Sequence, residues 1–251
     1  EAEKPADTPD RAATAEPQPD CAEDRFEDAG FTHCLADPAT KSIGMRLIGE
    51  DREPLRSLTA LALERDAGAV AFAMNGGMYD DKGMPVGYYV ENGVRVHDIN
   101  RNDGPGNFHM KPNGIFFGSD GKWQILTTDD FAAQIGTRPQ FATQSGPMLV
   151  IDGKLHPEIA DDGESKYIRN AVGVDEEGRA HFVISDQPVS FGKLARYMRD
   201  RLKTPNALYL DGKVSALWDA GADRIDTMTD LGPLIVVKNK PADATAKDGA
   251  Q

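Results

Sequence analysis

Short apolar runs, each closed by a turn that contains glycine, are the feature that most restricts what this chain can fold into. Such runs predict strands at 70–74, 87–91, 114–117, 123–126, 147–151, 171–174, 181–185, 207–210 and 234–237. Asn92-Gly93, Asp120-Gly121 and Asp152-Gly153 are typical of tight turns between strands. Helical spacing is found at 57–68 and 190–202, with Ser57 and Ser190 as N-caps. The pattern predicts an α+β fold: a single domain with a mixed, mainly antiparallel β-sheet packed by a few helices.

Both ends of the chain have the composition of linkers. Residues 1–20 and 239–251 are rich in Ala, Pro and charged residues and poor in large apolar side chains, which predicts disorder and a folded unit at 21–238. The net charge of −13 argues against nucleic acid or an anionic membrane as a partner. No apolar run reaches the roughly 20 residues that a transmembrane helix needs. The oligomeric state has no signal in the sequence.

The two cysteines, Cys21 and Cys34, flank a short segment at the start of the predicted folded unit. One interpretation is a disulfide that pins an N-terminal strand; the other is a pair of free thiols in a cytosolic protein. The Pro- and Ala-rich leader and the start at Glu1 favour the disulfide. A periplasmic or extracellular location is therefore expected, with a lipoprotein as one possible full-length form.

Polar residues at the ends of predicted strands are the candidates for a functional site. Asn75, Asp186 and Asp211 follow apolar runs, whereas Gln144-Ser145-Gly146, Arg169-Asn170 and Lys111-Pro112-Asn113 precede them. Each of these residues taken alone is typical of a turn or a cap. Together they supply carboxylates, cations, amides and hydroxyls, which suit an anionic, hydroxyl-rich ligand. The histidines show no metal-ligand spacing, and no cofactor motif is present, so neither a metal nor a cofactor is expected.

The ordered motifs of the chain resemble the phosphodiester glycosidase family, which includes the enzyme that uncovers mannose 6-phosphate, in its largely uncharacterised bacterial branch. They are AFAMNGGMY, PVGYYVENG, GPGNFHMKPNGIFF, ATQSGPMLV, RNAVGV, HFVISD and NALYLDGKVS. The family's motifs correspond to Asn75-Gly76-Gly77, Ser145-Gly146, Arg169, Asp211-Gly212 and Ser215. Lys213 and Val214 depart from the family pattern, because they replace two glycines. The resemblance implies an α+β fold, a site in a cleft of the sheet, and a phosphorylated or anionic carbohydrate as ligand.

This resemblance implies hydrolysis of a sugar-1-phosphodiester, and the chemistry of that bond suggests roles for the candidates. Arg169 would grip phosphate oxygens, Asp211 would activate water or attack the anomeric carbon, and Asp186 would be its partner. The predicted substrate-binding residues are Asn75, Gly76, Gly77, Lys111, Asn113, Gln144, Ser145, Gly146, Asn170, Gly212 and Ser215. Three alternatives remain open: a non-catalytic module that binds anionic glycans, a phosphodiesterase acting on envelope polymers, and a purely structural envelope protein.

Overall fold

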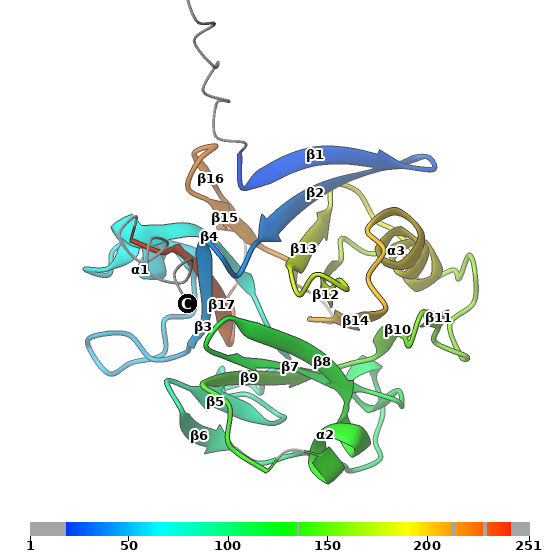
Figure 1. The fold of residues 1–251 in the computed structure, drawn as a ribbon, viewed down its shortest axis with the longest axis horizontal. Helices are drawn as coiled ribbons and strands as arrows, with labels where there is room; N and C mark the ends of the chain where they lie inside the picture. The colour runs from blue at the N-terminus through cyan, green and yellow to red at the C-terminus, as the bar shows by residue number, and fades with distance from the viewer. Residues whose placement is uncertain (1–18, 135, 212–213, 228–229, 242–251) are drawn as a thin grey trace, which may run out of the picture.

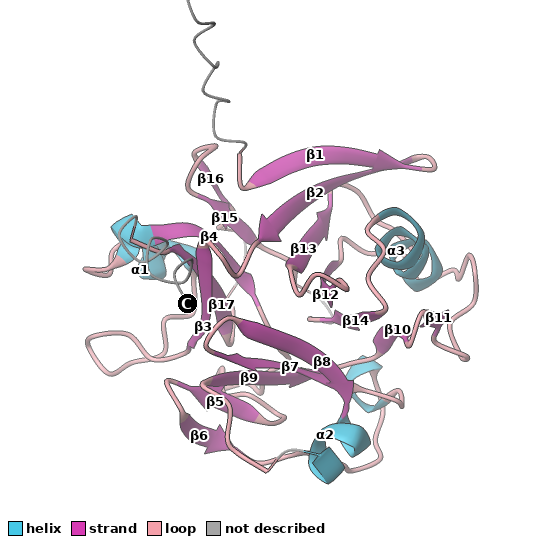
Figure 2. Ribbon diagram, in the orientation of Figure 1, coloured by secondary structure: helices cyan, strands magenta, loops and turns pink. Residues whose placement is uncertain are grey.

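Strands dominate the protein. A computed structural model describes residues 19–134, 136–211, 214–227 and 230–241. The strands are β1 (Cys21–Phe26), β2 (Ala29–Ala36), β3 (Lys41–Arg46), β4 (Val70–Asn75), β5 (Tyr89–Glu91), β6 (Val94–His97), β7 (Gly114–Ser119), β8 (Lys122–Thr127), β9 (Phe141–Ser145), β10 (Met148–Ile151), β11 (Lys154–Leu155), β12 (Asn170–Val174), β13 (Ala180–Ser185), β14 (Asn206–Tyr209), β15 (Leu217–Asp219), β16 (Arg224–Ile225) and β17 (Leu234–Asn239). The α-helices of the described residues are α1 (Leu58–Ala62), α2 (Thr128–Gln134) and α3 (Phe191–Arg196). Figure 2 shows these helices at the periphery of the strands.

The strands form three sheets rather than one. Their orders are β1-β2-β13-β12-β14-β10-β11, β16-β15-β4-β17-β3 and β6-β5-β9-β7-β8. Every strand pairing in the described part of the chain is antiparallel. Figure 1 shows the three sheets arranged around a common interior. The α+β class and the mainly antiparallel pairing are thus confirmed, while the single expected sheet is divided into three.

The predicted tight turns join neighbouring strands. Asn92, Asp120 and Asp152 adopt positive φ angles of 50°, 51° and 47°, and each is followed by a glycine that is also at positive φ. These turns close the hairpins β5–β6, β7–β8 and β10–β11. Two successive residues at positive φ favour Asn, Asp and Gly, which is why the sequence located these hairpins.

The helices are shorter than their sequence patterns suggested. Ser57 and Ser190 cap α1 and α3 as predicted, since their hydroxyls accept hydrogen bonds from the backbone N–H of Ala60 and Lys193. However, α1 ends at Ala62 and not at Gly68, and α3 continues as a π-helical turn over Tyr197–Arg201. Helix α2 was not predicted, because Phe131 is its only large apolar residue.

Strand β9 was not predicted. Gln144 and Ser145 precede β10, as expected, and they also form the end of β9. Asn170 was expected just before a strand and is the first residue of β12. A disulfide joins Cys21 on β1 to Cys34 on β2, which confirms the bonded interpretation of the two cysteines. In the segments that the structure describes, no helix is long and apolar enough to cross a membrane.

The interior between the three sheets is the main hydrophobic core. Val172, Phe182 and Leu208 from the first sheet pack with Phe72 from the second and Phe116 from the third. A separate cluster lies between the first sheet and α3. The ends of several strands from all three sheets consequently meet at the edge of one core, where Asn75, Ser145 and Asn170 lie among the predicted polar residues.

Candidate functional site

Asn75 is the centre of a buried polar cluster where strands of different sheets end. It is the last residue of β4 and is fully buried. Its Nδ2 donates to Asp211 Oδ2 (3.0 Å) and to the backbone oxygen of Val214 (2.6 Å). Its Oδ1 accepts from the backbone N–H of Ala216 (2.8 Å) and from Asn170 Nδ2 (2.9 Å). One neutral side chain therefore fixes the segment on both sides of residues 212–213 against β4 and β12.

Asp211 is a carboxylate withdrawn from bulk solvent. It follows β14 and is 5% exposed. Burial of a carboxylate is costly unless hydrogen bonds or charges stabilise it, and the Asn75 amide supplies one such bond. Asp211 also affects its neighbours, since its negative charge adds to the effect of burial in raising the pKa of Tyr79.

Asn170 contributes a buried acceptor to this cluster. Its Nδ2 donates to both the backbone oxygen and Oδ1 of Asn75, each at 2.9 Å. A backbone oxygen can only accept, so this bond fixes which end of the Asn170 amide faces Asn75. Asn170 Oδ1 is then left without a hydrogen-bond partner among the described residues. Such an atom is suited to accept from a hydroxyl or a water.

The two glycines after Asn75 let the chain pass closely over β17 of the same sheet and β9 of the third sheet. A Cβ on Gly76 would lie 2.2 Å from Ile235 Cγ1, and one on Gly77 would lie 2.5 Å from Thr143 Oγ1. Gly77 also has a φ of +140°, which favours glycine. Thr143 donates from Oγ1 to the backbone oxygen of Gly76 (2.6 Å), which fastens this turn to β9.

Ser145 lies in the same region and is bonded to the chain itself. It is fully buried, and its Oγ donates to the backbone oxygen of Leu210 (2.8 Å), directly before Asp211. The structure thereby brings together Asn75, Asn170, Ser145 and Asp211, which are residues that the sequence placed on four separate strand ends. We refer to these four residues as the polar cluster.

Arg169 is next to the polar cluster in sequence, and its guanidinium is bound to groups outside that cluster. It is 1% exposed. Its Nε donates to the backbone oxygen of Val189 (2.9 Å), Nη1 to Tyr209 OH (3.0 Å), and Nη2 to the backbone oxygen and Oγ of Ser165 (2.9 and 3.1 Å). Its guanidinium carbon lies 3.7 Å from the centre of the Phe191 ring. That Arg169 binds phosphate oxygens of a substrate stays a prediction.

Asp186 and Ser215 contact residues outside the polar cluster. Asp186 follows β13, is exposed, and accepts from Thr32 Oγ1 (3.0 Å). Ser215 Oγ donates to the backbone oxygen of Ile168 (3.1 Å). Gly212, the remaining predicted residue of this segment, lies outside the described residues.

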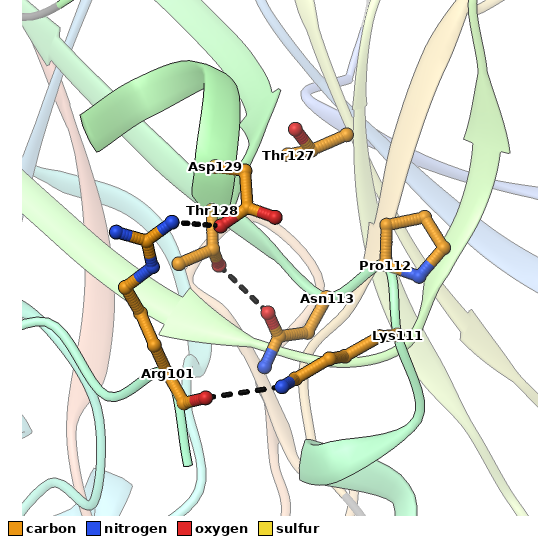
Figure 3. Close-up of a pocket in the computed structure, with 7 residues that line it drawn as sticks. All are labelled: Arg101, Lys111, Pro112, Asn113, Thr127, Thr128 and Asp129. Carbon is orange, nitrogen blue, oxygen red and sulfur yellow. Dashed lines mark hydrogen bonds and ion pairs between the residues drawn. The ribbon is translucent and has the colours of Figure 1, made fainter. Parts of the chain in front are cut away.

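Lys111, Asn113 and Gln144 belong to a different region, on the outer face of the third sheet. Lys111 and Asn113 line a cavity of about 540 Å³ with Arg101, Pro112, Thr127, Thr128 and Asp129 (Figure 3). Asn113 Oδ1 accepts from Thr128 Oγ1 (2.7 Å), and Gln144 Nε2 donates to the same hydroxyl (3.1 Å).

The charges around this cavity are paired within the chain. Arg101 Nη2 contacts Asp129 Oδ1 (2.6 Å), and Lys111 Nζ contacts Asp103 Oδ1 (2.5 Å). Gly146 forms the link to the polar cluster, because a Cβ there would lie 2.7 Å from Asn113 Cβ. The cavity therefore adjoins the cluster through the end of β9 without containing it.

Tyr209 and Tyr79 are affected by the charge of Asp211 and were not among the predicted site residues. Burial raises the pKa of Tyr209 to about 12, against the opposing effect of Arg169, and Asp211 adds a smaller rise. Tyr79 donates from its hydroxyl to the backbone oxygen of Asp230 (2.6 Å). Tyr79 could have been identified from the sequence, since it closely follows Asn75-Gly76-Gly77. Tyr209, by contrast, has the pattern of an ordinary strand residue.

Among the described residues, no group of three or more His, Cys, Asp or Glu side chains could hold a metal ion.

Comparison with known proteins identifies the family. The phosphodiester glycosidase family matches residues 68–249, which include every residue of the polar cluster. The chain belongs to the phosphodiester glycosidase family. It is also 37% identical over 185 residues to the uncharacterized protein YigE of Escherichia coli (strain K12), covering 73% of this chain and 72% of that protein.

Solved structures support the fold of this phosphodiester glycosidase domain. One is the catalytic domain of zebrafish N-acetylglucosamine-1-phosphodiester alpha-N-acetylglucosaminidase, auto-inhibited by its pro-peptide, with 15% identity and a TM-score of 0.54 over 88% of this chain and 82% of that chain. Another is a putative exported protein of Burkholderia pseudomallei K96243, with 12% identity and a TM-score of 0.56 over 84% and 74% of the two chains. At these identities the likeness concerns the fold alone.

Proposed function

We propose that this protein is a glycoside hydrolase that cleaves a sugar-1-phosphodiester, with Asp211 as its central carboxylate. The observation that carries the proposal is the burial of Asp211 against Asn75 at the meeting of the sheets, in a domain of the phosphodiester glycosidase family. A carboxylate held in a partly desolvated polar cluster is a recurrent feature of catalytic sites. The proposed substrate is a phosphorylated carbohydrate of the cell envelope or exterior.

The proposed reaction breaks the bond between the anomeric carbon and the phosphate oxygen. Water adds its oxygen to the anomeric carbon, one water proton leaves through the base, and a phosphate monoester departs with the bonding electrons. Phosphate is a weak base, so its departure needs less protonation than that of an alkoxide and depends more on charge stabilisation. Asp211 is the proposed base or nucleophile, and Asp186 its proposed partner.

The other members of the polar cluster have positioning roles in this proposal. Asn75 has no proton to exchange near neutral pH, so it orients Asp211. Asn170 Oδ1 accepts from a sugar hydroxyl or from the attacking water, because it has no partner within the described part of the chain. Lys111 and Asn113 line the adjoining cavity and are proposed to contact the more distant part of the substrate.

An isosteric substitution tests the proposal. Asp211→Asn keeps the shape and the neighbouring Asn75 but removes the charge, and we expect kcat on a panel of p-nitrophenyl sugar-1-phosphodiesters to fall at least about 1,000-fold. Asp219→Asn is the matched control, since Asp219 is also a buried carboxylate but lies at the far end of β15. Full activity of Asp211→Asn, with both variants folded, would refute the assigned role.

The same panel distinguishes the alternatives. A glycan-binding module would bind the sugar phosphodiesters without turnover. A phosphodiesterase would break the phosphorus–oxygen bond, so that hydrolysis in ¹⁸O-labelled water would place the label in phosphate and not in the sugar. The disulfide supports the further proposal that the protein works in an oxidising compartment, either the periplasm or the cell exterior.

A further inference from the structure

Two neighbouring large apolar residues lie exposed beside the polar cluster. Tyr167 is 52% exposed and Ile168 is 45% exposed, and both immediately precede Arg169. Single exposed apolar residues are common on protein surfaces and need no explanation. This pair differs because its backbone is held in place and because it adjoins the segment that carries Asp211.

Hydrogen bonds hold the backbone of this pair rigidly. Tyr167 and Val189 form an isolated antiparallel bridge, in which the N–H of Tyr167 donates to the Val189 oxygen (3.3 Å) and the N–H of Val189 donates to the Tyr167 oxygen (2.8 Å). A fixed backbone reduces the conformational entropy that a ligand must remove when it binds.

Arg169 holds the same structure together from beneath. Its guanidinium donates to Val189 on one side of the bridge and to Ser165 on the other. Its guanidinium carbon also lies 5.4 Å from the centre of the Tyr167 ring, within the range of a cation–π contact. The buried arginine therefore orients both the backbone and the ring of Tyr167.

Ser215 connects this pair to the polar cluster. Its hydroxyl donates to the backbone oxygen of Ile168 (3.1 Å). The next residue, Ala216, donates its backbone N–H to Asn75 Oδ1 (2.8 Å). The hydrogen bonds of Ser215 and Ala216 therefore connect Ile168 to Asn75, whose Nδ2 donates to Asp211.

We propose that the ring of Tyr167 forms a platform for the pyranose ring of the substrate, and that Arg169 is the positioning residue of this platform. A pyranose has a face of C–H groups that packs on an apolar surface, while the tyrosine hydroxyl remains free to contact polar groups. The platform rests on the proposed function, because it names the part of a sugar phosphodiester that binds beside Asp211.

Substitutions at Tyr167 test the platform by kinetics. We expect Tyr167→Ala to raise KM about five- to tenfold with kcat little changed, whereas Tyr167→Phe keeps the ring and restores KM. Leu63→Ala is the control, because Leu63 is 83% exposed and is the C-cap residue of α1. An unchanged KM in Tyr167→Ala would overturn the platform.

A binding experiment separates failure of the platform from failure of the proposed function. Calorimetry on the Asp211→Asn protein compares a sugar 1-phosphate with inorganic phosphate. The platform predicts that Tyr167→Ala, added to Asp211→Asn, weakens sugar 1-phosphate about five- to tenfold and leaves phosphate unchanged. Equal losses for both ligands, or no binding of any sugar 1-phosphate, would refute it, whether or not the wild-type protein shows turnover.

Arg169→Lys distinguishes positioning from direct contact with phosphate. A lysine keeps the charge but cannot reproduce the planar set of bonds to Val189, Ser165 and Tyr209. Positioning predicts a raised KM with kcat preserved and no further loss when Tyr167→Ala is added. A loss of kcat in Arg169→Lys, in addition to any rise in KM, would instead support direct contact of Arg169 with phosphate and contradict the positioning role.

Discussion

Asn75 shows how much one neutral side chain can organise. Its amide makes four hydrogen bonds, to Asp211, Val214, Ala216 and Asn170. An aspartate in its place could donate to neither Asp211 nor Val214 and would set a second negative charge beside Asp211. The residue type at this strand end is therefore determined by its partners, and the requirement is for one donor group and one acceptor group in the same side chain.

A second polar group at the residue scale is the hydrogen-bonded series His33–His181–Asp175, in which His181 and Asp175 are buried. His33 Nε2 lies 3.0 Å from His181 Nδ1, and His181 Nε2 lies 2.9 Å from Asp175 Oδ2. If Nε2 of each ring carries the proton, both contacts are satisfied with neutral histidines. Burial lowers the pKa of His33 to about 4, and it also lowers that of His181 against the opposing effect of Asp175.

This histidine pair predicts a loss of stability in mild acid. Because the pKa of His33 is depressed in the folded state, its contribution is present above the unfolded value of about 6.5 and is lost as the pH falls towards 4. From pH 7 to pH 5 we expect the free energy of unfolding to fall about 1–2 kcal/mol more in the wild type than in His33→Gln. The neighbouring charges, Asp24 and Arg201, are unchanged in both proteins.

Urea denaturation at the two pH values measures the difference. Glutamine retains a donor for His181 but does not titrate, so carboxylates elsewhere contribute equally to both profiles. If the free energy of unfolding falls equally with pH in the two proteins, His33 does not cause the loss of stability in mild acid.

At the scale of elements, the β1–β2 hairpin depends on its disulfide. Strand β1 forms one edge of the first sheet, and its residues after Cys21 are largely exposed. Cys21 and Cys34 are directly opposite one another in the register of this hairpin. The bond fastens a strand that buries little apolar area of its own.

Removal of the disulfide is predicted to destabilise the protein substantially. We expect Cys21→Ser with Cys34→Ser to lower the free energy of unfolding by about 2–4 kcal/mol, since the crosslink restricts the unfolded chain. Guanidinium denaturation with and without reductant measures this loss. Reductant should weaken the wild type and leave the double variant unaffected; equal stability of the oxidised wild type and the variant would contradict the prediction.

At the scale of the whole molecule, the order of strands controls how far apart the two proposed carboxylates lie. Asp186 follows β13 and Asp211 follows β14, and β12 lies between these strands. Two strand spacings amount to roughly 10 Å between the backbones. The Asp186 carboxylate also leans toward Gly30 and Thr32 on β2, away from β12, so the two carboxylates lie farther apart than the roughly 5–5.5 Å of the pair in retaining enzymes.

The sheet order therefore predicts inversion at the anomeric carbon. Proton NMR of a reaction followed from its first minute would show the sugar product in the anomer opposite to that of the substrate. Retention of the anomeric configuration would exclude Asp186 as the partner of Asp211. The partner would then have to be a group closer to Asp211.

Much of the local structure could be predicted from the sequence, because its causes are local. Hairpins at Asn92-Gly93 and Asp120-Gly121 follow from residues that tolerate positive φ, and the caps at Ser57 and Ser190 follow from their hydroxyls. Helix α2 escaped prediction because its stability comes from one buried phenylalanine packed on the third sheet. The division into three sheets depends on long-range pairing, which short patterns do not specify.

The sequence by itself determined the family, the α+β class and the polar residues at the strand ends, because motifs, turns and caps are properties of neighbouring residues. Only the tertiary structure decided which of those residues meet. It joined Asn75, Ser145, Asn170 and Asp211, placed Lys111 and Asn113 in an adjoining cavity, and set Arg169 against the ring of Tyr167. The physical reason is that residues distant in sequence become neighbours through strand order and the alternation of side chains across a sheet.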